Sequence, residues 1–276
     1  MKSVFTRGNT LGFATEGRDG GTEGLDFEVK NLLEAVEADL FYYLGCTPAY
    51  DPRIQPVSRA LATVFRRAGL DFGTLGVDEM CCGNEVRRMG ESEGFSSMVE
   101  EAHEMYKEFK AQRMVTVSPH CFNAFKNEYG DMPFQVQHYT QLLVELLDQG
   151  KLKLGNEVRK KVTYHDPCFL GKHNSIYDEP RAILQAIPGL EFEDLDRSRE
   201  RSVCCEGGGG RMWAEGTNIE DRLAHQRVRD AVDLGAEVLA VACPFCLLTL
   251  EDAVKTLGLD DKIQVMDIME LVAQAM

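Results

Sequence analysis

The sequence predicts an α/β protein made of two related halves whose sheets are mainly parallel. Nine cysteines fall into two sets that repeat the same order of elements, 122 to 125 residues apart. Short apolar runs, typical of buried strands, alternate with amphipathic stretches of helical periodicity in both halves. Alternating strands and helices are typical of parallel sheets, and a repeated order of elements indicates a duplicated unit. We therefore expect two pseudo-symmetric, Rossmann-like halves.

The composition limits the class of protein. The chain has 276 residues and a formal net charge of −15, and its sequence pI is about 4.9. An acidic surface repels nucleic acid, so we expect no nucleic-acid partner. The sequence contains no run of about 18 apolar residues, and its first residues lack the apolar core of a signal peptide. We expect a cytoplasmic protein that reaches a membrane only through partners.

The chain divides into three segments. Residues 8–24 carry six glycines and show no apolar periodicity. We interpret residues 1–24 as a Gly-rich tail or a segment that orders on a partner. Residues 25–150 are predicted to form the first half and residues 151–276 the second half.

The predicted strands and helices occur as matched pairs, with one member in each half. The strand pairs are 40–45 with 161–166 and 114–117 with 238–241, and the helix pair is 97–113 with 218–234. A cysteine element follows directly after each of these strands. Because ligands collect at the carboxyl ends of parallel strands, we expect the cysteines of a half to meet at one rim of its sheet.

The cysteines themselves indicate metal or redox chemistry. Disulfides are rare in cytoplasmic proteins, and an odd number of cysteines cannot all be paired. A [4Fe–4S] or zinc site needs about four thiolates, and adjacent cysteines suit a cluster of several metal atoms better than one zinc ion. The first half supplies Cys46, Cys81, Cys82 and Cys121, and the second half supplies Cys168, Cys204, Cys205, Cys243 and Cys246.

Two other interpretations of the cysteines are weaker. Buried cysteines can be inert packing residues, but inert thiols would not need a duplicated spacing. The string Cys243-Pro244-Phe245-Cys246 alone could be a thioredoxin-like dithiol. It has a partner motif in the first half, which favours a shared metal-binding role instead.

The repeated pattern of a single cysteine, a Cys-Cys-Gly doublet and a Cys-Pro-x-Cys element resembles the CCG-domain, or cysteine-rich domain, family. This family includes the B- and D-type subunits of heterodisulfide reductases and related iron–sulfur reductase subunits. The resemblance covers about residues 36 to 272. Further matching strings are Cys46-Thr47-Pro48, Ser118-Pro119-His120-Cys121-Phe122-Asn123, His165-Asp166-Pro167-Cys168-Phe169-Leu170-Gly171 and Gly208-Gly209-Gly210-Arg211-Met212-Trp213.

The resemblance implies a non-cubane [4Fe–4S] cluster on the five cysteines of the second half, at which a disulfide or thiol substrate is reduced or formed. The four cysteines of the first half are then expected to hold a second iron–sulfur cluster or zinc. The resemblance also implies a ferredoxin-like iron–sulfur subunit as electron donor, because this chain has no CxxCxxCxxxCP string. A flavin subunit or a membrane quinone-linked subunit is a further expected partner.

Two alternatives remain for the function. One is a non-catalytic relay subunit that passes electrons from a flavoprotein or an organic-acid dehydrogenase to a quinone-linked partner. The other is a zinc–thiol scaffold. Iron, sulfide and zinc counts distinguish the scaffold, and the response of the cluster spectrum to a disulfide distinguishes the relay.

Splitting a disulfide also requires protons, so acid–base groups beside the cysteines are candidates. His165 is our candidate catalytic residue. Other groups that flank the ligands in the sequence are Lys172, His173, Arg211 and, in the first half, His120.

The sequence departs from the family pattern at two positions. Ser118 stands opposite Cys243, so the first half offers four thiolates where the second offers five. Glu206 stands where the doublet is followed by glycine in the first half. Glycine at that position would permit a positive φ or a close backbone approach, and we expect Gly207 to compensate.

Overall fold

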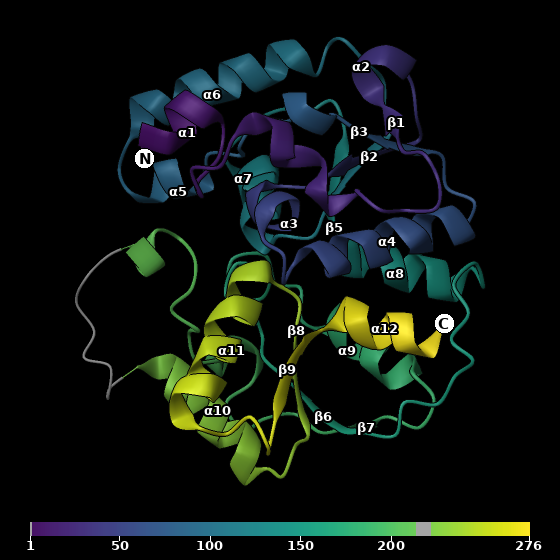
Figure 1. Cartoon of the computed structure of the whole chain (residues 1–276), viewed down its shortest axis with the longest axis vertical. Coiled ribbons are helices and arrows are strands. Elements are labelled where there is room, and N and C mark those ends of the chain that lie inside the picture. Colours follow the sequence, from purple (N-terminus) through teal and green to yellow (C-terminus); the bar gives the residue numbers. More distant parts are fainter. Residues whose placement is uncertain (1, 214–221) are drawn as a thin grey trace. The chain divides into compact units, whose positions relative to one another are not determined.

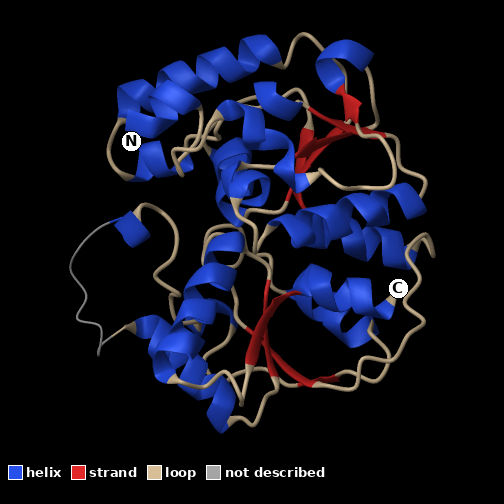
Figure 2. Ribbon diagram, in the orientation of Figure 1, coloured by secondary structure: helices blue, strands red, loops and turns tan. Residues whose placement is uncertain are grey.

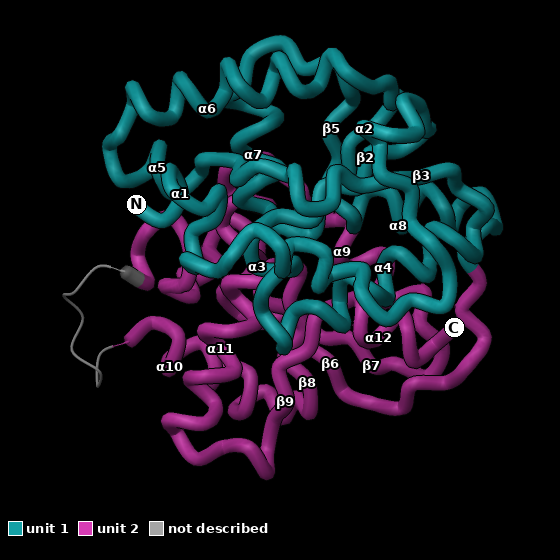
Figure 3. Tube along the Cα trace, turned by 45° about the horizontal axis from the view of Figure 1, so that its top comes forward, with its two compact units in different colours: residues 1–152 teal, residues 153–276 magenta. Residues whose placement is uncertain are grey.

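The chain folds into two compact units, residues 1–152 and 153–276 (Figure 3). The computed structural model describes residues 2–213 and 222–276 (Figure 1). Within each unit, helices enclose a parallel sheet (Figure 2). The predicted α/β class with two parallel sheets is confirmed.

The sheet of unit 1 has five parallel strands in the order β1-β3-β2-β4-β5. Every residue of the central strand β2 is buried, which explains why its sequence is a continuous apolar run. The strands are β1 Lys30–Asn31, β2 Leu40–Tyr43, β3 Phe72–Thr74, β4 Arg113–Thr116 and β5 Gln135–His138. The helices, including the 3₁₀ turns η1 and η2, are α1 Lys2–Arg7, η1 Thr15–Gly21, α2 Leu32–Ala35, α3 Cys46–Tyr50, α4 Gln55–Arg67, η2 Gly76–Asp78, α5 Asn84–Arg88, α6 Ser92–Met105, α7 Pro119–Asn127 and α8 Tyr139–Asp148.

Unit 2 repeats this arrangement with four parallel strands in the order β7-β6-β8-β9. This is the order β3-β2-β4-β5 of unit 1, so the duplicated cysteine spacing reflects a duplicated topology. The strands are β6 Lys161–Tyr164, β7 Glu191–Phe192, β8 Val238–Val241 and β9 Gln264–Asp267. The helices are α9 Asp178–Ala186, η3 Arg199–Arg201, η4 Arg211–Trp213, α10 Leu223–Asp233, α11 Pro244–Leu257 and α12 Ile268–Ala275.

The helix predicted over residues 97–113 is shorter than expected. Helix α6 ends at Met105. Residue Lys110 already forms a parallel bridge with Glu37, and its N–H donates to the Val36 carbonyl at 2.8 Å. The backbone therefore has to leave the helix before it can join the sheet. In the second helix of the pair, α10 lies inside the predicted range, and residues 218–221 lie outside the described residues.

The Gly-rich start, expected to be a tail or a partner-ordered segment, packs into unit 1. The η1 turn lies against α3, and a Cβ at Gly20 would be 2.5 Å from the Ala49 carbonyl oxygen. A Cβ at Gly21 would be 2.9 Å from the Pro48 carbonyl oxygen. Gly20 and Gly21 are therefore required for close backbone packing, which a count of glycines does not distinguish from flexibility.

An aromatic core supports the first set of cysteines. The ring of Phe41 makes edge contacts with Tyr43, Phe109 and Phe134, and the Phe125 ring lies 4.7 Å from the Tyr43 ring. The same buried cluster includes the cysteines Cys46, Cys81, Cys82 and Cys121.

Among the described residues 2–213 and 222–276, no helix has the length and apolar character needed to cross a bilayer.

His138 joins β5 to α8 and is fully buried. Its Nε2–H donates to the Val117 carbonyl at 3.0 Å, and its Nδ1 lies 2.8 Å from the Thr140 hydroxyl. The side chain also completes a capping box with Gln141 at the start of α8. Burial lowers the pKa of His138 to about 3, so the native ring stays neutral.

This histidine should make unit 1 lose stability in mild acid. Between the unfolded pKa near 6.5 and about 3, the unfolded chain binds a proton that the native chain does not. The free energy of unfolding should therefore fall as the pH drops below about 6.5, by at most about 5 kcal/mol for this group. Urea unfolding from about pH 7.5 to pH 5 should show a shallower slope for His138→Asn, which keeps a cap but does not titrate. Equal slopes in the two proteins would contradict this account.

Candidate metal centres

The cysteines of each unit lie where its strand order reverses. In unit 1 the reversal falls between β2 and β4, and in unit 2 it falls between β6 and β8. Cys46 and Cys168 follow the first strand of these pairs, and Cys121 and Cys246 occupy the first turns of α7 and α11 after the second strand. Parallel strands separate their connections at such a point, which leaves room for a ligand at their carboxyl ends.

The structure brings together all five cysteines of unit 2. The Sγ atoms of Cys205 and Cys246 are 3.2 Å apart. The Cys168 thiol hydrogen-bonds to Cys204, and Cys246 hydrogen-bonds to Cys243. The hydrogen bond with Cys204, burial, and the proximity of Cys205 and Cys243 raise the pKa of Cys168. Three segments far apart in the chain therefore place their sulfur atoms around one centre.

This centre is buried on one side and open on the other. Cys205, Cys243 and Cys246 are buried, Cys168 is partly buried, and Cys204 is exposed. Backbone N–H groups support the doublet, since Glu206 N donates to Cys204 Sγ at 3.3 Å and Gly207 N donates to Cys205 Sγ at 3.4 Å. Peptide dipoles aimed at sulfur stabilise thiolate charge.

The exposed cysteine, Cys204, has a lowered pKa. The hydrogen bond from Cys168 lowers the pKa of Cys204 to about 6, and the Glu206 N–H and the Lys172 charge act in the same direction. Burial of Cys246 raises its pKa, as do its hydrogen bonds with Cys205 and Cys243. The exposed side of the centre, which we call its open edge, therefore carries Cys204 as a thiolate at neutral pH.

The position after each doublet requires a left-handed backbone. Gly83 follows the first doublet with φ of 72°, and Glu206 follows the second with φ of 62°. Glu206 thus adopts the glycine-like conformation itself, and its carboxylate accepts the Leu223 N–H at 2.8 Å at the start of α10. Gly207 does not take over the positive φ. It serves a close approach, because its Cβ would lie 2.8 Å from the Phe245 carbonyl oxygen.

His165 lies beside the buried part of the centre. One of its ring nitrogens and the Sγ atoms of Cys205 and Cys246 lie within 4.8 Å of one another. The buried Arg227 donates to His165 Nδ1 at 3.3 Å, so the neutral ring carries its proton on Nε2. Burial, and then the Arg227 charge, lower the pKa of His165 well below its ordinary value.

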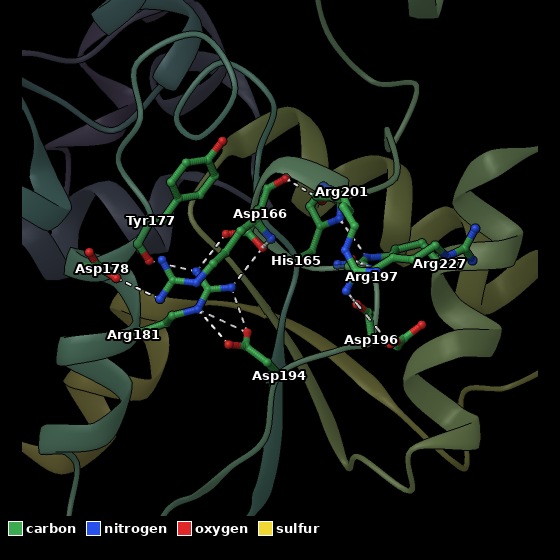
Figure 4. A network of polar contacts seen from close by, with 12 residues as sticks. His165, Asp166, Tyr177, Asp178, Arg181, Asp194, Asp196, Arg197, Arg201 and Arg227 are labelled. Atoms are coloured by element: carbon green, nitrogen blue, oxygen red, sulfur yellow. Dashed lines mark hydrogen bonds and ion pairs between the residues drawn. The ribbon is translucent and has the colours of Figure 1, made fainter.

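An ion-pair network fixes the chain just before Cys168. Figure 4 shows Arg181 between Asp166 and Asp194, with His165 and Arg227 on the other side of the same strand end. Arg181 donates to the two carboxylate oxygens of Asp166 at 2.7 and 3.0 Å and to Asp194 at 2.7 Å. Two parallel hydrogen bonds fix both the distance and the relative orientation of the Arg181 and Asp166 side chains. The pair therefore fixes the backbone just before Cys168.

The four cysteines of unit 1 also meet. Cys46 hydrogen-bonds to Cys81, and Cys82 hydrogen-bonds to Cys81 and Cys121. All four are buried, and all four have raised pKa values. The hydrogen bonds to Cys81 and Cys121, together with burial, raise the pKa values of Cys46 and Cys82. The hydrogen bonds from Cys46 and Cys82 lower the pKa values of Cys81 and Cys121, and burial outweighs them together with the neighbouring cysteines and Glu85. Ser118 occupies the N-cap of α7 before its proline, as Cys243 does in α11, so the two positions are structurally equivalent. The set of unit 1 is therefore smaller by one sulfur and is closed.

The other acid–base candidates from the sequence, apart from His165, differ in their distance from the cysteines and in their contacts. Lys172 is close enough to influence Cys204, and the His173 ring stacks on Phe169 at 4.5 Å. Arg211 lies 3.7 Å from the Glu206 carboxylate. The Nδ1 atom of buried His120 is 3.2 Å from Asn84 Nδ2.

Sequence reasoning missed the buried charged residues around both centres. These residues are Arg18 and Glu79 in unit 1 and Asp166, Arg181 and Arg227 in unit 2. Asp166 stands out in the sequence only as part of a motif string. Arg18 stands in the Gly-rich segment and has no periodic neighbours, so the sequence carries no signal of its burial.

Comparison with known proteins relates these centres to a described domain. A family model described as a cysteine-rich domain, CCG, matches residues 40–126 and 162–251. The two matched ranges contain the two sets of cysteines.

Three relatives are about one third identical to this chain over the aligned residues. The EtfAB:quinone oxidoreductase of Syntrophomonas wolfei is 36% identical over 90% of this chain and 36% of its own length. The probable iron-sulfur-binding oxidoreductase FadF of Bacillus subtilis is 34% identical over 100% of this chain and 40% of its length. The D-type subunit of the dihydromethanophenazine:CoB–CoM heterodisulfide reductase of Methanosarcina acetivorans is 36% identical over 88% of this chain and 60% of its length. The chain thus spans less than two thirds of the length of each of these relatives.

The Asp166–Arg181 pair should contribute strongly to stability. Asp166→Asn leaves the buried guanidinium of Arg181 without one of its two carboxylates, which should cost about 3 kcal/mol of unfolding free energy. Asp178→Asn is the matched control, because Asp178 pairs with Arg199 at the surface and its side chain is 83% exposed. Urea unfolding should show a large loss for the first variant and little change for the second. Similar small losses in both would contradict the role of the pair.

Gly207 should tolerate no side chain. In Gly207→Ala the new Cβ would lie 2.6 Å from Thr249 Oγ1 and 2.8 Å from the Phe245 carbonyl oxygen, so the doublet must move away from α11. We expect a loss of about 1–3 kcal/mol in unfolding free energy and loss of metal from unit 2. Gly155→Ala is the control, since its Cβ would meet nothing within 4 Å. Calorimetry and metal counts that do not distinguish the two variants would refute this constraint.

Proposed function

The chain belongs to the cysteine-rich CCG-domain family, and on that premise we propose that it is an iron–sulfur oxidoreductase subunit that reduces or forms a disulfide at the five cysteines of unit 2. The match confirms the resemblance seen in the sequence. Relatives named as heterodisulfide reductase subunits and iron–sulfur oxidoreductases support an oxidoreductase that works within a complex.

The open edge of the unit 2 centre is the observation that carries this proposal. A disulfide must reach the reacting atoms, and Cys204 is exposed while Cys168 is partly buried. All four cysteines of unit 1 are buried. We therefore assign the chemistry to unit 2 and a supporting role to unit 1.

The donor set of unit 2 fits an iron–sulfur cluster. Five sulfur atoms converge, two of them only 3.2 Å apart, and backbone N–H groups point at the doublet. We propose that a non-cubane [4Fe–4S] cluster is held by Cys168, Cys204, Cys205, Cys243 and Cys246. When bound, such a cluster supplies the electrons and an iron atom that accepts substrate sulfur. We propose a second iron–sulfur cluster or zinc on Cys46, Cys81, Cys82 and Cys121.

The reaction also sets what the surrounding residues have to do. Reduction of a disulfide breaks its S–S bond, consumes two electrons and two protons and releases two thiols, and oxidation is the reverse. His165 and Lys172 are our candidates for moving these protons. His165 holds its proton on Nε2 because Arg227 donates to Nδ1, and Lys172 influences the exposed Cys204.

The partners follow from the same chemistry. The electrons are proposed to come from a ferredoxin-like iron–sulfur subunit and from a flavin or membrane quinone-linked subunit. The name of the Syntrophomonas relative, an EtfAB:quinone oxidoreductase, supports a quinone link. The net charge of −15 disfavours nucleic acid.

One alternative rests on that same relative. A chain similar to an EtfAB:quinone oxidoreductase could serve as a non-catalytic relay between a flavoprotein and a quinone-linked partner. The two functions differ in whether a disulfide binds at the open edge of the unit 2 centre. A disulfide substrate should change the EPR spectrum of the oxidised unit 2 cluster if the chain is catalytic, and an unchanged spectrum favours the relay.

Anaerobic metal and activity measurements test the proposal. Cys246→Ala should abolish disulfide turnover and remove iron and sulfide from unit 2, while unit 1 keeps its metal. The matched variant Cys121→Ala changes the equivalent position of unit 1 and should show the reciprocal pattern of metal loss. Elemental analysis, sulfide assays and EPR follow both sites. Wild-type protein with zinc and no iron would sink the proposal, and equal losses at both sites in each variant would indicate general unfolding.

A further inference from the structure

A buried arginine of the N-terminal segment reaches the first set of cysteines. Arg18 lies in the η1 turn, is 1% exposed, and places Nη1 3.9 Å from Cys46 Sγ. The same Nη1 donates to the Gly8 carbonyl at 3.0 Å, and Nη2 donates to the Met80 carbonyl at 3.3 Å. The guanidinium thus connects the N-terminal segment, the start of α3 and the chain before the doublet.

A carboxylate holds the guanidinium in this position. Glu79 Oε1 accepts from Arg18 Nη2 at 2.9 Å, and the Glu79 side chain is fully buried. The carboxylate also accepts the N–H groups of Leu44 at 2.7 Å and Gly45 at 2.8 Å, just before Cys46. Arg18 and two backbone N–H groups therefore balance the negative charge of Glu79. The other terminal nitrogen of Arg18, Nη1, points toward Cys46 Sγ.

This arrangement has an electrostatic consequence for a redox centre. Reduction adds a negative charge to an iron–sulfur cluster and its thiolates. A hydrogen-bond donor or positive charge beside a ligand sulfur stabilises the reduced form more than the oxidised form, and so raises the reduction potential. The effect is large where burial excludes water, as at Cys46 and its neighbours.

We propose that Arg18 is a positioning residue that donates to Cys46 and raises the reduction potential of an iron–sulfur cluster on the first set of cysteines, with Glu79 holding it in place. The inference rests on the proposed metal site of unit 1. It assigns a role to the Gly-rich segment, which packs within unit 1 and places the positive charge of Arg18 beside Cys46.

Two substitutions that remove charges of opposite sign, one at Arg18 and one at Glu79, test this role. In the Cys246→Ala variant of this chain, which should keep metal only on the first set of cysteines, EPR-monitored redox titration measures the midpoint potential of that cluster. Arg18→Gln removes the positive charge and should shift the potential down. Glu79→Gln removes a negative charge and should shift it up, and the double variant should return close to the parent. A purely structural role would not give opposite signs.

Two further variants control for disturbed packing. Arg59→Gln removes another arginine that ties the same segment, through the Gly20 carbonyl at 2.9 Å, and should leave the potential unchanged. Arg18→Lys keeps the positive charge and should have a midpoint potential close to that of the Cys246→Ala parent, so the test remains possible if Arg18→Gln does not fold.

The outcomes separate this inference from the proposed function. Shifts of the same sign in Arg18→Gln and Glu79→Gln, or an unchanged potential in Arg18→Gln, overturn the inference while the disulfide chemistry of unit 2 stands. Zinc without iron on the first set also overturns it and leaves unit 2 untouched. Absence of iron from both sets overturns the inference together with the proposed function.

Discussion

The structure depends on one constraint, which is that sulfur atoms from distant parts of the chain must meet in a small volume. Parallel strands solve this problem because their carboxyl ends share an edge, and the reversal of strand order between β6 and β8 separates the connections there. The doublet then has to approach α11 closely enough to bring Cys205 within 3.2 Å of Cys246. Only a glycine at position 207 allows that approach.

The two units share a topology but support their cysteines with different charges. Unit 1 places the guanidinium of Arg18 next to a sulfur and balances it with Glu79. Unit 2 uses Arg227 to orient His165, and Arg181 with Asp166 to fix the chain before the first cysteine. The two units therefore share their strand order and the placement of their cysteines but differ in the buried ion pairs around them.

The centres also differ in access. The unit 1 set is buried and one sulfur smaller, because Ser118 stands at the helix N-cap where unit 2 has Cys243. The unit 2 set leaves Cys204 exposed, and a hydrogen bond from Cys168 lowers its pKa to about 6. A closed centre suits electron storage or stability, and an open one suits a substrate.

The sequence by itself determined the fold class, the duplication and the two sets of cysteines, because fully buried strands appear as continuous apolar runs and the cysteines recur at the same spacing in both halves. It failed where a residue's role depends on contacts with distant segments. The helix predicted to run to residue 113 stops early because Lys110 pairs with Glu37, and the Gly-rich start packs closely because its glycines meet the carbonyls of α3. Only the tertiary structure decided where Arg18 and Arg227 lie, since burial of a charge depends on partners that local sequence does not encode.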